Sequence, residues 1–67
     1  MMIMVEGPKL HEFRQDNRKA EVYRHNKGFV VRMFDNGLWL EDRVIENHSE
    51  SYAEECAENF VIGVIHA

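Results

Sequence analysis

The stretch Gly28-Phe29-Val30-Val31-Arg32-Met33-Phe34-Asp35-Asn36-Gly37-Leu38-Trp39-Leu40-Glu41-Asp42-Arg43-Val44-Ile45 decides the fold. Its centre, Asn36-Gly37, separates two runs of strand-forming residues and is a strong signal for a β-hairpin with a two-residue turn. Such a turn needs positive φ at both central positions, which asparagine and glycine tolerate best. The stretch therefore predicts two antiparallel strands and also the register between them.

A two-residue turn pairs Phe34 with Trp39 and Arg32 with Glu41. Because side chains alternate along a strand, one face of the hairpin is predicted to be apolar and to meet a helix. That face would hold Phe29, Val31, Met33, Leu38, Leu40 and Val44. The opposite face would hold Val30, Arg32, Phe34, Trp39, Glu41, Arg43 and Ile45.

A third strand is predicted over residues 20–24, where apolar and charged residues alternate before a turn-forming segment. A four-residue loop at His25–Gly28 places Val22 beside Val31 on the core face and Glu21 beside Arg32 on the other. A three-residue loop would turn Val22 outward, so the four-residue loop is favoured.

The C-terminal part of the chain has the pattern of an amphipathic helix over residues 50–65. Ser51 and Glu54 match a capping box, and Ser49 is the rival N-cap residue. Apolar residues then recur at spacings of three and four, which predicts one buried stripe. The stripe consists of Ala53, Cys56, Ala57, Phe60, Val61 and Val64.

The first 19 residues give a weaker pattern. Pro8 prevents a helix from running through this point, so Met1–Val5 is predicted to be an edge strand or a tail. Leu10 and Phe13 fit either one helical turn or a short irregular strand. The predicted fold is a single α+β domain over 1–67. It has a three-stranded antiparallel meander at 20–47 and one C-terminal helix on one face, in the order β-β-β-α.

The charge and the cysteine content of the chain limit the classes of function to which it can belong. The 67 residues carry a net charge of -4, but residues 1–32 sum to +3 and residues 33–67 to -7. An acidic chain disfavours binding to a phosphate backbone. The one cysteine cannot form an internal disulfide, and no apolar run approaches the roughly 18 residues of a membrane span. We therefore expect a cytoplasmic protein that does not enter the membrane.

No pattern of catalytic or metal-binding residues is found. The four histidines (His11, His25, His48 and His66) and Cys56 lack the paired spacings of zinc sites. Cys56 lies within the apolar stripe of the helix and reads as a core residue. No glycine-rich phosphate loop and no nucleophile–base arrangement can be assembled. The sequence predicts a protein that is not an enzyme and that has no catalytic, cofactor or metal site.

The element order over residues 20–65 resembles AP2-type DNA-binding domains and the arm-binding domains of phage integrases. This resemblance implies that the exposed sheet face enters the major groove, with Arg24, Arg32 and Arg43 as the basic residues. Glu21 and Glu41 on the same face depart from the strongly basic pattern of those families. Nucleic-acid binding is therefore the alternative function and not the preferred one.

A second resemblance rests on four segments: Tyr23-Arg24, Gly28–Met33, Leu40–Arg43 and His48–Asn59. Together they look like a small uncharacterised protein of tailed phages that infect marine cyanobacteria. The resemblance implies the cytoplasm of an infected host and implies no known activity. Small phage proteins of this kind often bind a host protein or regulate the infection.

The outward hairpin face is the predicted contact surface, because exposed apolar patches and Trp, Tyr and Arg residues are typical of interfaces. We expect a small interaction or regulatory protein that binds a host protein or a second copy, most simply as a homodimer. Cover of this face by residues 1–13 is an equally weighted alternative. The predicted contact residues are Tyr23, Val30, Arg32, Phe34, Trp39, Glu41 and Arg43.

Overall fold

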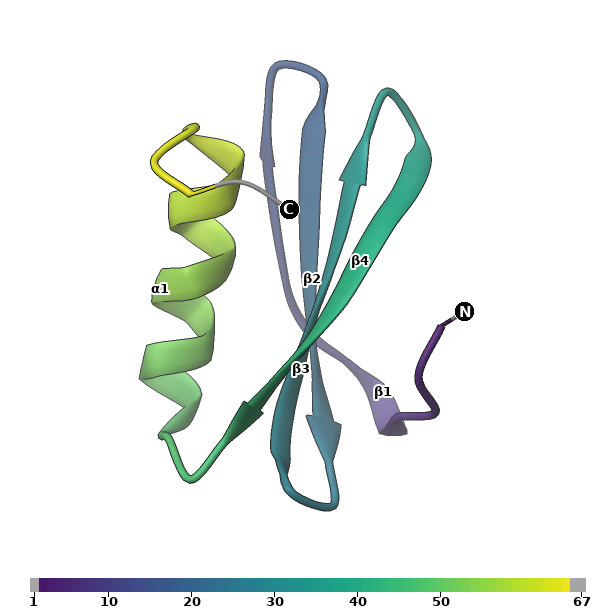
Figure 1. The fold of residues 1–67 in the computed structure, drawn as a ribbon, viewed down its shortest axis with the longest axis vertical. Helices are drawn as coiled ribbons and strands as arrows, with labels where there is room; N and C mark the ends of the chain where they lie inside the picture. The colour runs from purple at the N-terminus through teal and green to yellow at the C-terminus, as the bar shows by residue number, and fades with distance from the viewer. Residues whose placement is uncertain (1, 66–67) are drawn as a thin grey trace.

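The computed structural model describes residues 2–65, which form a four-stranded antiparallel sheet and one helix. The elements are β1 (Glu6–Gln15), β2 (Arg18–His25), β3 (Gly28–Asp35), β4 (Leu38–Glu46) and α1 (Glu50–Val61). The strands lie side by side in chain order. Helix α1 lies along one side of the sheet, and the residues before β1 lie on the opposite side (Figure 1). The predicted α+β class, with an antiparallel sheet and a C-terminal helix, is confirmed.

The prediction of three strands is wrong, because β1 adds a fourth strand at the edge beside β2. His11 pairs with Val22 and Phe13 with Ala20, so both side chains share the side that packs on α1. The ladder is irregular between Glu6 and His11, where Pro8 has no N–H to donate. This irregularity hides the alternation by which a strand is recognised in a sequence.

The predicted register between β2 and β3 is confirmed. Val22 pairs with Val31 and Glu21 with Arg32, and the ladder closes on a pair between His25 and Gly28. A Cβ atom on Gly28 would lie 2.3 Å from the carbonyl oxygen of Ile45 on β4. Only glycine fits at this point, because its φ is +142° and the neighbouring backbone is too close for a side chain.

The predicted register between β3 and β4 holds at the turn and then fails. Phe34 pairs with Trp39 as expected, but Met33 pairs with Glu41 instead of Leu40, and Arg32 with Asp42. Leu40 is therefore an extra residue, a β-bulge, and every later residue of β4 faces the side opposite to the predicted one.

Helix α1 packs against β1, β2 and β3, with most of its contacts to β2 and β3. Ala53 and Ala57 are fully buried, and their small side chains let the helix approach the sheet closely. Arg18 on β2 donates a hydrogen bond of 2.9 Å to the carbonyl of Phe60 and lies over its ring. The core consists of Ala20, Val22, Phe29, Val31, Met33, Ile45, Ala53, Ala57, Phe60 and Val61.

The helix begins at Glu50 as the sequence predicts, but its N-cap is not Ser51 and it ends at Val61, four residues earlier than expected. Ser49, the rival residue, is the N-cap, and its hydroxyl accepts a hydrogen bond from the amide of Tyr52. At the other end Gly63 has φ +86°, and the amides of Gly63 and Val64 donate to the carbonyls of Phe60 and Asn59. This is a Schellman cap, and it ends the helix before residues 62–65. Within residues 2–65 no helix is long and apolar enough to cross a membrane.

Candidate functional site

The side of the sheet away from α1 is called the outer face here. It carries Lys19, Glu21 and Tyr23 from β2, Val30, Arg32 and Phe34 from β3, and Trp39, Asp42 and Val44 from β4. Five of the seven predicted contact residues therefore lie on this face. They are Tyr23, Val30, Arg32, Phe34 and Trp39.

The placement of the other two, Glu41 and Arg43, on the outer face is wrong. The bulge at Leu40 pairs them with Met33 and Val31, two core residues, so they face the side of α1. Arg43 donates hydrogen bonds to Glu41 on its own strand, the shorter of them 2.9 Å long. Ile45, which was also expected on the outer face, is buried in the core.

An ion pair between Arg32 and Asp42 forms the centre of the outer face. Nε of Arg32 donates to Oδ1 of Asp42 and Nη2 donates to Oδ2, both at 3.0 Å. The two side chains are only 12% and 1% exposed, respectively. Nε1 of Trp39 also donates to Oδ1 of Asp42, at 2.7 Å. A paired, largely buried arginine and carboxylate with this bidentate geometry is held in one orientation.

Two opposing effects act on the pKa of Asp42. Burial raises this pKa, but the hydrogen bonds from Arg32, from Trp39 and from the amide of Ile3 together lower it by a larger amount. The pKa of Asp42 therefore lies below its ordinary value. The hydrogen bond to Asp42 likewise raises the pKa of Arg32. Both groups are therefore charged at neutral pH, and each stabilises the charge of the other.

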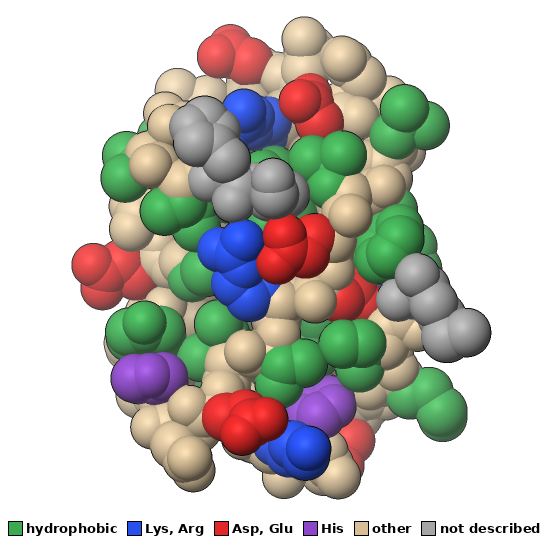
Figure 2. Space-filling model, viewed as in Figure 1, with side chains coloured by type: hydrophobic (Ala, Val, Ile, Leu, Met, Phe, Trp, Pro, Cys, Tyr) green, Lys and Arg blue, Asp and Glu red, His purple; other side chains and the backbone are tan. Residues whose placement is uncertain are grey.

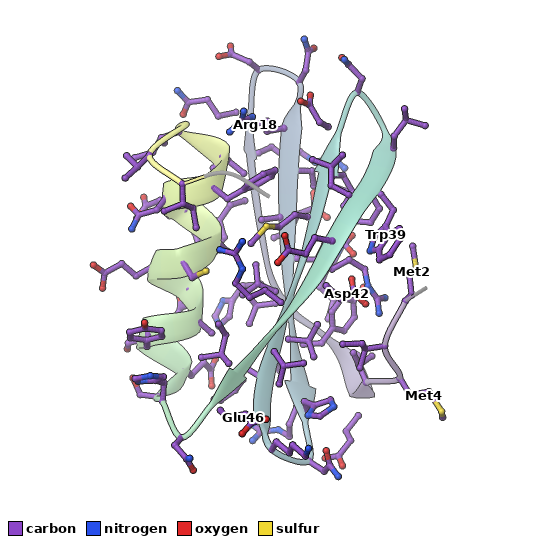
Figure 3. All side chains as sticks on the ribbon, viewed as in Figure 1. Met2, Met4, Arg18, Trp39, Asp42 and Glu46 are labelled. Atoms are coloured by element: carbon purple, nitrogen blue, oxygen red, sulfur yellow. The ribbon has the colours of Figure 1, made fainter. Side chains whose placement is uncertain are left out.

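Residues 2–5, called the N-terminal segment here, are bound to this ion pair. The amide of Ile3 donates to Oδ2 of Asp42 at 2.6 Å, and Nη2 of Arg32 donates to the carbonyl of Ile3 at 2.7 Å. Met2 and Met4 are exposed, whereas Ile3 and Val5 are half-buried. The alternation indicates an extended segment that turns Ile3 and Val5 towards the sheet. Met2 and Met4 lie on the same side as Trp39 and Asp42, away from α1 (Figure 3).

The N-terminal segment covers part of the predicted apolar patch. Val30 is 0% exposed although it lies on the outer face. Ile3, Met4 and Val5 line a shallow hollow together with His25 and Asn26 at the β2–β3 turn. The segment therefore runs from β4 across the sheet before the chain enters β1. Of residues 1–13, which were the alternative cover for this face, residues 2–5 lie over it, residues 6–13 belong to β1 within the sheet, and Met1 lies outside the described residues.

The rest of the outer face is balanced in charge. Lys19 lies 4.2 Å above the ring of Phe34, and its ammonium is 3.4 Å from a carboxylate oxygen of Glu21. The hydroxyl of Tyr23 donates to Glu21 at 3.0 Å, and Arg32 lies over the Tyr23 ring. Burial and this hydrogen bond raise the pKa of Tyr23. Each basic group named here is thus engaged with a carboxylate or a ring.

A second hollow lies on the other side of the sheet, between β4 and α1. It has a volume of about 380 Å³, and Arg43, Ile45, Tyr52, Cys56 and Ile65 are among its lining residues. Burial raises the pKa of the Cys56 thiol, and the neighbouring Arg43 only partly opposes this effect. A thiol with a raised pKa is a poor nucleophile at neutral pH. On the face of the molecule that Figure 2 shows, apolar side chains form separate groups divided by charged ones.

His11, Glu50 and Glu54 form a cluster that the sequence analysis missed, because β1 was not recognised as a strand next to the helix. The atoms that could bind a metal ion lie within 4.8 Å of one another, which is close enough for three ligands of one ion. However, Nε2 of His11 contacts Glu50 at 2.6 Å, whereas Nδ1 faces Glu54 at 3.6 Å. One ion cannot bind both ring nitrogens, so the arrangement is that of a histidine bridging two carboxylates. His66 lies outside the described residues.

Sequence reasoning missed Asp42 as part of the outer face and left open whether the start of the chain covers this face. Unbroken alternation through Leu40 puts Asp42 on the helix side, and a bulge cannot be recognised from alternation alone. The available signal was the run of apolar residues at the start of the chain, which would be unfavourable if it were exposed throughout. No protein-family model, curated protein or solved structure matches this chain.

Proposed function

We propose that this protein is a non-enzymatic binding protein whose contact surface is the outer face together with the N-terminal segment. The observation that supports this most directly is the contact between the Arg32–Asp42 pair and Ile3, because the pair holds the main chain of an extended segment. Around it lie the exposed Met2 and Met4 and the partly exposed Trp39. Methionine is common at binding surfaces because its flexible side chain adapts to a partner, and tryptophan is enriched among the residues that contribute most of the binding energy.

The charges of this surface favour a protein partner over nucleic acid. Arg32 is engaged with Asp42 and with the carbonyl of Ile3, and Lys19 is engaged with Glu21. Lys9 is likewise paired with Glu12. Basic side chains that are already paired with carboxylates displace few counterions from a phosphate backbone, and counterion release supplies most of the affinity for nucleic acid. The net charge of -4 further disfavours such binding.

The partner is a second copy of the chain or a protein of the producing cell. The single cysteine fits a reducing compartment, which supports the cytoplasm as the site of action. The resemblance to cyanophage proteins would place the partner in the infected host.

Site-specific photo-crosslinking tests this proposal. A photoreactive residue replaces Met4, which is 90% exposed beside the outer face, and a matched control replaces Glu55 on the exposed side of α1. We expect crosslinks to a second copy or to another protein from position 4 and none from position 55. Trp39→Ala is expected to reduce the crosslinking from position 4. Equal yields at the two positions, or no crosslinks at all, would contradict the proposal.

A further inference from the structure

The hydrogen bonds between Ile3 and the Arg32–Asp42 pair involve the backbone atoms of Ile3 and not its side chain. Asp42 accepts the N–H of Ile3, and Arg32 donates to the C=O of the same residue. An N–H and a C=O that belong to one residue are offered in the same way by any chain in an extended conformation. The pair is therefore a built binding site for one residue of an extended chain.

The surroundings of the pair define the side chains that fit it. Ile3 and Val5 are half-buried, and Val30, on the same outer face of β3, is fully buried. Met2 and Met4, at the intervening positions, are exposed. The preferred occupant thus has apolar, β-branched residues at alternate positions, and the side chains at the intervening positions can vary because they face solvent.

The N-terminal segment is attached in a way that permits its release. It lies across the outer face and is not paired in the ladder of the sheet, because β1 begins only at Glu6. The ladder between β1 and β2 is itself irregular between Glu6 and His11. The hydrogen bonds described above between the segment and the ion pair both involve one residue, Ile3.

We propose that the N-terminal segment occupies, in cis, the site for an extended apolar segment of the partner protein, and that binding displaces it. This inference rests on the proposed function and names what the outer face recognises. A tethered segment acts at an effective concentration of the order of millimolar, so a ligand in trans must compete with it. The apparent affinity of the intact protein equals the affinity of the open site multiplied by the fraction of molecules whose site is open.

The test uses the full-length chain and a peptide with the sequence of residues 2–7, Met-Ile-Met-Val-Glu-Gly, blocked at both ends. Ile3→Pro removes the N–H that Asp42 accepts and so frees the site, whereas Met4→Pro makes the same substitution one residue further along. Trp39 is the only tryptophan and donates to Asp42, so its fluorescence reports on the occupant. Circular dichroism checks that each variant is folded.

We expect the peptide to change Trp39 fluorescence saturably in Ile3→Pro and to bind wild type at least about tenfold more weakly, because the site is occupied there. A peptide with proline in place of isoleucine lacks the donated N–H and is expected not to bind. Adding Asp42→Asn to Ile3→Pro is expected to abolish binding. If Ile3→Pro does not fold, a titration of the wild type to high peptide concentration replaces it.

Two outcomes would overturn the inference. One is no response of the released variant to the peptide; the other is equal binding of the isoleucine and proline peptides. If crosslinking from position 4 still depends on Trp39 in that case, the outer face binds its partner in another way, and only the inference fails. If crosslinking fails while the peptide binds, the site accepts extended segments but the proposed function is wrong.

Discussion

Asp42 lies directly opposite Arg32 on the outer face because one extra residue, Leu40, bulges out of β4. Without the bulge, Arg32 would pair with Glu41, and Asp42 would face α1. The shift brings a carboxylate to within 3.0 Å of both Nε and Nη2 of Arg32 and within reach of Trp39 and Ile3. The register that follows the bulge thus places Asp42, and with it the site, on the outer face.

The Arg32–Asp42 pair should dominate the stability of this face. Removing one member leaves the other largely buried without its counter-charge, so Asp42→Ala and Arg32→Leu are each expected to lower the free energy of unfolding by about 3 kcal/mol. The double variant should lose at least about 1 kcal/mol less than the sum of the two. Urea denaturation of the four proteins measures this coupling. Additive effects would show that the two side chains do not act as a pair.

The parts of the fold that sequence reasoning predicted are those where alternation is unbroken. Val22 and Val31 pair as expected because His25–Gly28 permits only one register that buries both. The helical stripe is confirmed at Ala53, Ala57, Phe60 and Val61. It is wrong at Val64, which is exposed beyond the end of α1, and Cys56 is only partly buried.

The parts that were missed are those where the ladder is irregular. The strand β1 contains Gly7-Pro8 and a shift of register, and β4 contains the bulge at Leu40. Both irregularities depend on the twist and packing of the whole sheet, which local alternation does not encode. The contact between Ile3 and the Arg32–Asp42 pair follows from both, so it could not be predicted from the hairpin alone.

Deletion of Leu40 provides a direct test of the bulge. The pairs on either side, Phe34 with Trp39 and Met33 with Glu41, become consecutive when the extra residue is removed. We therefore expect the shortened chain to keep the Arg32–Asp42 pair and to lose no more than about 1.5 kcal/mol in unfolding free energy. Urea denaturation and Trp39 fluorescence measure these effects. An unfolded chain would show that the bulge is needed for the twist of the sheet.

Two large apolar side chains should differ sharply in their effect on stability. Phe60 is 1% exposed in the core, and Phe60→Ala is expected to cost about 3–5 kcal/mol. A chain of 67 residues has a total stability of roughly 3–10 kcal/mol, so this variant should lose about a third of its stability or more. Leu38 is 69% exposed, and Leu38→Ala should change stability by less than about 0.5 kcal/mol. Thermal denaturation compares them, and similar losses would contradict the packing described above.

The two candidate caps of α1 can be separated by one substitution each. Ser49 accepts the amide of Tyr52, so Ser49→Ala should cost about 0.5–2 kcal/mol. Ser51 lies inside the first turn and is exposed, and Ser51→Ala should have an effect of less than about 0.5 kcal/mol. Urea denaturation of both variants decides between the caps. A larger loss from Ser51→Ala would place the cap two residues later.

The interaction of Asp42 with the N-terminal segment should be lost at low pH. The pKa of Asp42 in the folded protein lies below the ordinary value of 3.8, so its contribution to stability is complete above pH 3.8. It is lost as the pH falls through the lowered pKa, because a protonated Asp42 no longer pairs with Arg32 or attracts the amide of Ile3. Trp39 fluorescence, followed from pH 5 downwards, should change in that range. Glu12 also titrates there, with a pKa of about 2, so the matched control is Asp42→Asn. That variant should lack the fluorescence transition while keeping the titration of Glu12, and an unchanged transition would assign the effect to another group.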